Sequence, residues 1–166
     1  MPEKKTLQRA RKDARQGKAS STQAGEFVRE EIEHIRQGKH GARSAKQAIA
    51  IGLSKARRAG VKLPPPKKGK ASPGTGTRAA RDYAQRKKSP DRPPSPTRSL
   101  AIKAALKREG QQAASHTALS RQAHASARSR SATGRRRAAE KAVRTKGRLG
   151  LRRAARKTEP TRARVR

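Results

Sequence analysis

Large apolar side chains are scarce along this chain, and their scarcity limits what it can fold into. Only 18 of the 166 residues are Leu, Ile, Val or Phe, about 11%, well below the roughly 20% under which a highly charged chain is expected to be disordered. Most of the hydrophobic content is Ala, which favours helix but buries little area. We therefore expect a mostly disordered chain with all-α segments and a core for only part of its length.

The large apolar residues that are present lie early and at helical spacing. One stripe runs through residues 22–37 and a second through residues 45–59, which Ser44 and Gln47 open at the spacing of a capping box. Ser21 or Thr22 is suited to cap the first helix. The short connection between the helices predicts a small helical hairpin. Its expected core is Phe27, Val28, Ile32, Ile35, Ile49 and Leu53.

Composition divides the chain into four regions. Residues 1–19 are expected to hold a basic N-terminal helix and residues 20–63 the helical hairpin core. Residues 64–98 form a Pro/Gly/Ser-rich linker with a short helical stretch near 78–87. Residues 99–166 form a basic Ala/Arg/Lys-rich tail. Its helices, expected at 99–109, 112–130 and 135–146, have too little apolar area to fold alone, so we expect them to be conditional on a partner.

Positive charge dominates the chain. Lys and Arg number 46 against 11 Asp and Glu, a net charge of +35, of which residues 61–166 carry +26. Polyanions are the natural partner, because each cation placed on a phosphate releases condensed counterions. The predicted nucleic-acid-binding residues of the tail are Arg135, Arg136, Arg137, Lys141, Arg144, Lys146, Arg148, Arg152, Arg153, Arg156 and Lys157.

Aromatic content favours backbone contact with a duplex over recognition of single strands; composition alone does not separate DNA from RNA, of which DNA is the favoured partner. Phe27 and Tyr83 are the only aromatic residues, so the chain lacks the stacking platform of RNA-recognition modules and single-strand binders. Two segments resemble the Ser-Pro-x-basic turns of linker-histone tails, which implies contact with narrow minor grooves; their residues are Ser89, Pro90, Arg92, Ser95, Pro96 and Arg98. A helix-turn-helix interpretation, with Lys46 and Gln47 in the major groove, is the less favoured alternative because the turn is six residues long.

Nothing in the sequence indicates catalysis, a cofactor or a metal. The chain has no Cys, and no two of its four His residues have the i, i+4 spacing of a helical zinc site. The acidic residues Glu26, Glu30, Glu31 and Glu33 have little volume in which to be buried and become general acids. We therefore predict a protein that is not an enzyme. Without a membrane-length apolar run or an N-terminal signal block, we expect a cytoplasmic, nucleoid-associated protein.

Residues 22–60 carry a resemblance to a known family. The segment Lys46 to Arg57 has the pattern KQAIAIxLSxAR, which resembles a family of small basic bacterial proteins of unknown function, often named DNA-binding or plasmid-stabilisation protein. The resemblance covers residues 1 to about 70, and the remainder resembles histone-H1-like bacterial tails in composition only. It implies a bacterial cytoplasmic or nucleoid location and supplies no active site.

Three functions follow as hypotheses. The first is histone-like, largely sequence-independent DNA binding by the basic tail; the second is an RNA- or ribosome-associated protein. The third is a protein-interaction module that uses the acidic helix 22–37, whose net charge is −2. Because such a helix is poorly suited to lie on phosphate, we expect it to face away from DNA, with Glu31 reaching a Lys or Arg at the helix interface. No oligomeric state is assigned.

Overall fold

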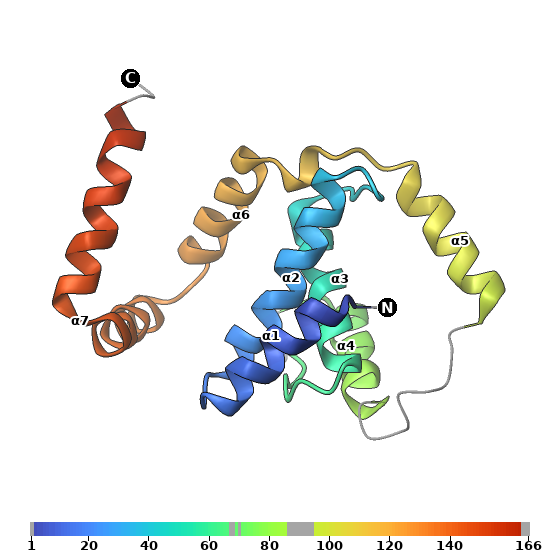
Figure 1. The fold of residues 1–166 in the computed structure, drawn as a ribbon, viewed down its shortest axis with the longest axis horizontal. Coiled ribbons are helices and arrows are strands. Elements are labelled where there is room, and N and C mark those ends of the chain that lie inside the picture. The colour runs from blue at the N-terminus through green and yellow to red at the C-terminus, as the bar shows by residue number, and fades with distance from the viewer. Residues whose placement is uncertain (1, 67–68, 70, 86–94, 164–166) are drawn as a thin grey trace. The chain divides into compact units, whose positions relative to one another are not determined.

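The computed structural model describes residues 2–66, 69, 71–85 and 95–163 (Figure 1). Every regular element within these residues is a helix, which confirms the all-α class. The chain forms two compact units, residues 1–122 and 123–166. In chain order the elements are α1 (Lys4–Arg15), α2 (Ser20–Arg36), α3 (Ala45–Arg58), α4 (Pro73–Gln85), α5 (Pro96–Lys107), the 3-10 helix η1 (Gln112–Ala114), α6 (His116–Arg128) and α7 (Ala132–Ala163).

Local signals define both ends of the loop between α2 and α3. Gly38 has a φ of 72°, and its N–H donates to Ile35 while that of Lys39 donates to His34, the paired bonds that close a helix on a left-handed residue. Ser44 then caps α3 by accepting from Gln47 N at 3.2 Å, as its spacing predicts. The start of α2 differs from expectation: Ala19 is its N-cap, with no side-chain hydrogen bond, so neither Ser21 nor Thr22 caps it.

The helix core is built mostly from Ala around a few large residues. Phe27 and Ile35 are fully buried, whereas the other four expected core residues, Val28, Ile32, Ile49 and Leu53, are only partly buried. Small residues take their place in the interior: Ala24, Ala42, Ala45, Ala48 and Ala56.

Gly52 explains why small residues occupy the interface between α2 and α3. A Cβ placed on Gly52 would lie 2.6 Å from Val28 Cα, closer than real Cβ atoms approach. The two helix backbones are therefore in near contact, and larger side chains flank this crossing rather than fill it.

Segments outside residues 20–63 complete the core. Leu7 and Ala10 of α1 pack with Phe27 in one cluster, and Ala113 and Ala114 of η1 pack with Ile35 in a second. The loop after α2 also hydrogen-bonds to the chain before η1, with Gly41 N donating to Leu106 O at 2.9 Å and Ala42 N to Gly110 O at 3.1 Å. The start of the expected tail is thus docked on the hairpin.

Part of the expected linker is also ordered against α3. Ser54 Oγ donates to Asp82 Oδ2 at 2.5 Å, and Ala79 of α4 is buried. The helix begins at Pro73 rather than near residue 78, since Pro is well suited to a first helical turn. An Asp and a small residue at the right spacing give α4 a contact with α3 that composition alone did not predict.

The tail helices differ from expectation in their bounds. α5 begins at Pro96, and Ser115 separates η1 from α6, whose Ala118 N–H bonds to the Ser115 hydroxyl. α7 starts at Ala132 rather than Arg135, but the predicted helix end after Lys146 is confirmed, because Gly147 interrupts α7 with a φ of 66° and a second helical segment follows it. No residue of α5 or α6 is buried. That these helices form only with a partner stays a prediction.

Candidate nucleic-acid interface

Helix α7 carries all the predicted phosphate-binding residues of the tail. Residues 137, 141 and 144 follow one another at i, i+4 and i+7, which places them on a single face of the helix before Gly147. The exposed members of the set are Arg135, Arg136, Arg137, Lys141, Arg144 and Arg152. Lys146, Arg148, Arg153, Arg156 and Lys157 also belong to α7, although their side chains lie outside what the structure describes.

The single acidic residue before Gly147 in α7 pairs locally. Glu140 Oε1 lies 3.3 Å from Arg136 Nε one turn away, and both side chains are well exposed. An exposed pair of this kind is weak and is screened by salt, so a phosphate oxygen competes readily for Arg136. This first half of α7 therefore presents cations with little opposing charge.

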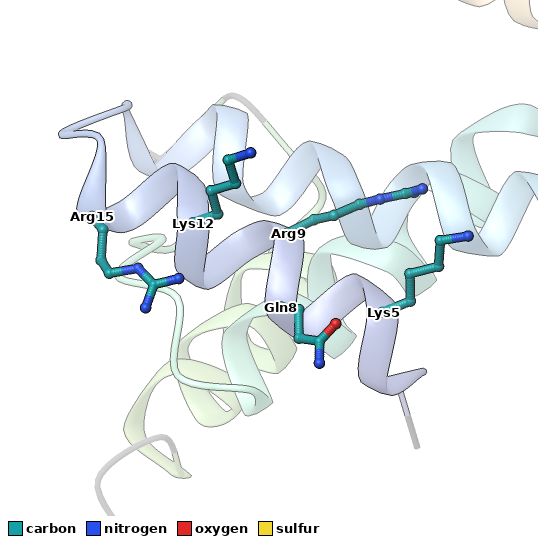
Figure 2. Close-up of a pocket in the computed structure, with 5 residues that line it drawn as sticks. All are labelled: Lys5, Gln8, Arg9, Lys12 and Arg15. Atoms are coloured by element: carbon teal, nitrogen blue, oxygen red, sulfur yellow. The ribbon is translucent and has the colours of Figure 1, made fainter.

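A second basic face lies on α1, where the sequence analysis assigned no site. Figure 2 shows the five side chains that line an open surface hollow along this helix: Lys5, Gln8, Arg9, Lys12 and Arg15. The four cations recur at helical spacing and leave Thr6, Ala10 and Asp13 to face the interior. Arg9 also approaches Glu26, with 3.8 Å between Nη1 and Oε2. Because these cations recur with the same helical periodicity as the apolar residues of the two stripes, the sequence alone indicates this charged face of α1.

Three acidic side chains lie inward beside basic partners, although the sequence predicted little volume in which to bury Glu30 and Glu31. Asp13, Glu30 and Glu31 are buried, and Asp13 Oδ1 lies 2.6 Å from Lys18 Nζ. Glu31 Oε2 lies 2.5 Å from Lys55 Nζ, which confirms the prediction that Glu31 reaches a basic residue at the helix interface. The inward acids leave the surface of this unit more cationic than its sequence charge suggests.

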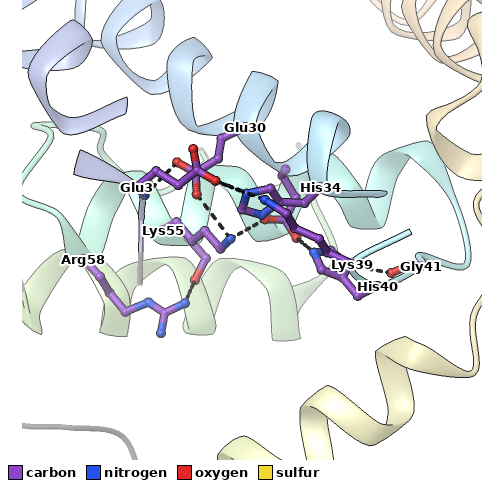
Figure 3. A network of polar contacts seen from close by, with 10 residues as sticks. Glu3, Glu30, His34, Lys39, His40, Gly41, Lys55 and Arg58 are labelled. Atoms are coloured by element: carbon purple, nitrogen blue, oxygen red, sulfur yellow. Dashed lines mark hydrogen bonds and ion pairs between the residues drawn. The ribbon is translucent and has the colours of Figure 1, made fainter. Parts of the chain in front are cut away.

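A polar network connects the N-terminus to the end of α2 (Figure 3). Glu3 accepts from His34 Nε2 at 2.8 Å and from Lys39 Nζ at 3.3 Å, and these two hydrogen bonds hold the pKa of the Glu3 carboxyl below its ordinary value. His40 Nε2 lies 3.1 Å from Glu31 Oε1. Sequence spacing alone does not connect these residues, because His40 comes after the helix has ended.

Two observations reduce the case for base reading by α3. Gln47 Oε1 accepts from Arg43 N at 2.9 Å, so this side chain is engaged in capping. Arg57 is buried and donates from Nε to Leu63 O at 3.2 Å, and burial lowers the pKa of its guanidinium. Of the residues proposed for the major groove, Lys46 alone is exposed without a capping role.

The two Ser-Pro segments have different outcomes. Ser89, Pro90 and Arg92 lie outside the described residues. Ser95, Pro96 and Arg98 do not form a separate turn: Ser95 is the N-cap of α5, and Pro96 and Arg98 belong to its first turn. Because Pro fits the first turn of a helix, the same Ser-Pro pattern that suggested a groove-binding turn begins a helix here.

No helix among the described residues is long and apolar enough to cross a membrane.

Comparison with known proteins gives a match to one family. Residues 15–68 match the model of a family of unknown function, DUF6496. No curated protein and no solved structure matches the chain. The matched segment contains α2, α3 and the paired carboxylates between them, whereas α5, α6 and α7 lie outside it. The family pattern therefore describes the helix core rather than the basic tail.

Proposed function

We propose that this protein is a non-enzymatic, histone-like binder of duplex DNA, which attaches largely without regard to sequence by placing Lys and Arg on phosphates. The observation that carries the proposal is the separation of charge. Asp13, Glu30 and Glu31 are buried in the helix core beside Lys18 and Lys55, while cations cover one face of α1 and the first half of α7. Each phosphate contact then releases counterions and adds affinity that is independent of the base sequence.

The positions of the aromatic residues support duplex over single strands. Phe27 is buried in the core and Tyr83 is partly buried on α4, so neither offers an exposed ring for a base to stack on. Without stacking, affinity depends on backbone contact, which a duplex supplies at high charge density.

Salt dependence tests the proposal directly. Titration of the full chain with duplexes of unrelated sequence should give equal affinities and a log K against log salt slope near −9 if about 10 phosphates are neutralised. A slope shallower than about −2, or strong preference for one duplex, contradicts it.

Charge variants in α7 locate the interface. The triple variant R137Q/K141Q/R144Q should reduce the magnitude of the salt slope by about 3, one for each phosphate that is no longer neutralised. The matched control R137K/R144K keeps the charges and should keep the slope. An unchanged slope in the triple variant would exclude this face of α7.

Two alternatives remain for the partner. The second candidate is an RNA- or ribosome-associated protein that binds folded RNA. Pull-down of the protein from lysate treated with DNase or with RNase distinguishes DNA from RNA as the partner, because only the matching nuclease removes the retained nucleic acid. The use of α2 as an acidic docking surface is disfavoured, because Glu30 and Glu31 are buried against α3 and inaccessible to a protein partner.

A further inference from the structure

We propose that Glu31, His34 and His40 bind one divalent transition-metal ion of the zinc class. One donor atom from each of the three side chains lies within 4.8 Å of those of the other two. This inference is independent of the nucleic-acid interface, since none of the three residues lies on α1 or α7.

The local fold brings these donors together. Glu31 and His34 are one turn apart on α2 and so share a face of the helix. The left-handed turn at Gly38 then reverses the chain, with Lys39 N bonded back to His34 O at 3.0 Å. This reversal returns His40 to the side of the helix that carries Glu31, whose Oε1 lies 3.1 Å from His40 Nε2. Figure 3 shows the rings of His34 and His40 near each other, with their centroids 6.2 Å apart.

Both ring nitrogens of His40 face oxygen atoms. Nδ1 lies 3.1 Å from the Gly41 carbonyl, which only accepts, so Nδ1 carries the proton in this contact. Nε2 then directs its lone pair toward Glu31 Oε1, 3.1 Å away. Two electron-rich atoms at this separation need either a proton or a metal cation between them. A histidine that donates from Nδ1 to a backbone carbonyl and ligates through Nε2 is a common arrangement at metal sites.

The buried charges also lack one positive partner. Glu30 and Glu31 are both buried and share the single ammonium of Lys55, which is 2.5 Å from Glu31 Oε2 but 3.8 Å from Glu30 Oε1. Glu30 Oε1 has no hydrogen-bond donor within the described part of the chain. One ammonium shared by two buried carboxylates leaves a net negative charge, which is costly, and a divalent ion beside Glu31 offsets it.

The donor set selects the class of ion. Two imidazole nitrogens and one carboxylate oxygen suit zinc and its neighbours rather than calcium or magnesium, which take oxygen ligands. Tetrahedral zinc holds its ligand atoms about 3.4 Å apart, close to the observed separation of His40 Nε2 and Glu31 Oε1. Lys55 holds the other oxygen of Glu31 and so directs Oε1 to the site.

An ion here would join the end of α2 to the loop that leads to α3. Because few large apolar residues hold this core together, a metal clip would supply stability that packing alone does not. The role is structural and leaves the cationic surface unchanged.

Binding of Zn²⁺ to the full chain tests the proposal. Calorimetric titration should give one ion per chain, and the melting temperature should rise by roughly 10 °C at a zinc concentration about 100 times the dissociation constant. H34A and H40A should each weaken binding at least tenfold. The double variant H116A/H124A removes two histidines of α6 that lie outside the cluster and should bind as the wild type does.

A second measurement guards against a variant that does not fold. In the wild-type chain, imidazole nitrogen resonances should shift on zinc addition for His34 and His40 but not for His116 and His124. Absence of binding, unchanged affinity in H40A, or equal shifts at all four histidines would overturn the proposal. A proton on His40 Nε2 would then satisfy its contact with Glu31.

Discussion

The helix core and α7 are built from similar residues and have opposite properties. Both are rich in Ala and in cations. In the core, the large side chains Phe27 and Ile35 anchor the Ala-lined contacts, and interspersed carboxylates pair with Lys18 and Lys55. In α7, Leu149 is 73% exposed and Glu140 pairs only at the surface. A few apolar anchors and acids therefore decide whether an Ala- and Lys/Arg-rich helix packs against its own chain or presents charge outward.

Removal of α7 is expected to have the largest effect. Residues 131–166 contain 14 basic and 2 acidic residues, and a chain that ends at Arg130 retains the docked η1 and all of α6. Duplex affinity at about 100 mM salt should fall by about 1,000-fold, while helicity of the remaining core is kept. Titration with labelled duplex and circular dichroism measure the two effects. Full retention of affinity would move the interface to α1.

A matched pair of apolar truncations tests the difference in packing. Phe27 is 1% exposed, so F27A should lower the free energy of unfolding by about 4 kcal/mol, because burial is reduced and a cavity forms. The control L149A in α7 should change it by less than about 0.5 kcal/mol. Chemical denaturation of the full chain measures both. Equal effects would mean that α7 packs as the core does.

Removal of Lys55, the cation that pairs with the two buried carboxylates, should be nearly as damaging. In K55M, Glu30 and Glu31 lose their shared ammonium, and the uncompensated buried charge should cost about 3 kcal/mol in the free energy of unfolding. Lys46 provides a control on the same helix, since it is exposed and K46M should be almost neutral. Similar stability of the two variants would show that Glu31 is not held by Lys55.

The smallest expected effect lies in the surface pair of α7. E140Q removes the partner of Arg136. The loss of this pair should make helix formation in α7 less favourable by about 0.3 kcal/mol at low salt, which circular dichroism of the full chain would show as a slight decrease in helical content. Affinity for duplex DNA should rise slightly, because one opposing charge is gone. A loss of affinity would assign Glu140 a positioning role instead.

The sequence predicted what depends on local periodicity and missed what depends on distant contacts. The two apolar stripes and the Ser44 cap follow from short-range rules. The docking of Ala113 and Ala114 does not, because nothing local distinguishes these from the other Ala residues.

The candidate sites divide in the same way. The tail cations could be named from charge alone, and the α1 face could have been found from helical spacing. The meeting of His34, His40 and Glu31 required the turn geometry at Gly38. Neither the turn's hydrogen bonds nor the close approach at Gly52, beside which four of the six expected core residues are only partly buried, is visible from residue types.

The hydrogen bonds from Gly41 and Ala42 to residues 106 and 110 affect the order in which the chain folds. The contacts among α1, α2 and α3 join near neighbours in sequence, whereas Ala48 meets Ala113 from 65 positions away. Closing so long a loop carries an entropic cost that local contacts do not. The three helices should therefore assemble first and η1 last, and the amide protons of Gly41 and Ala42 should exchange with solvent through a separate, lower-energy opening than those buried inside α2.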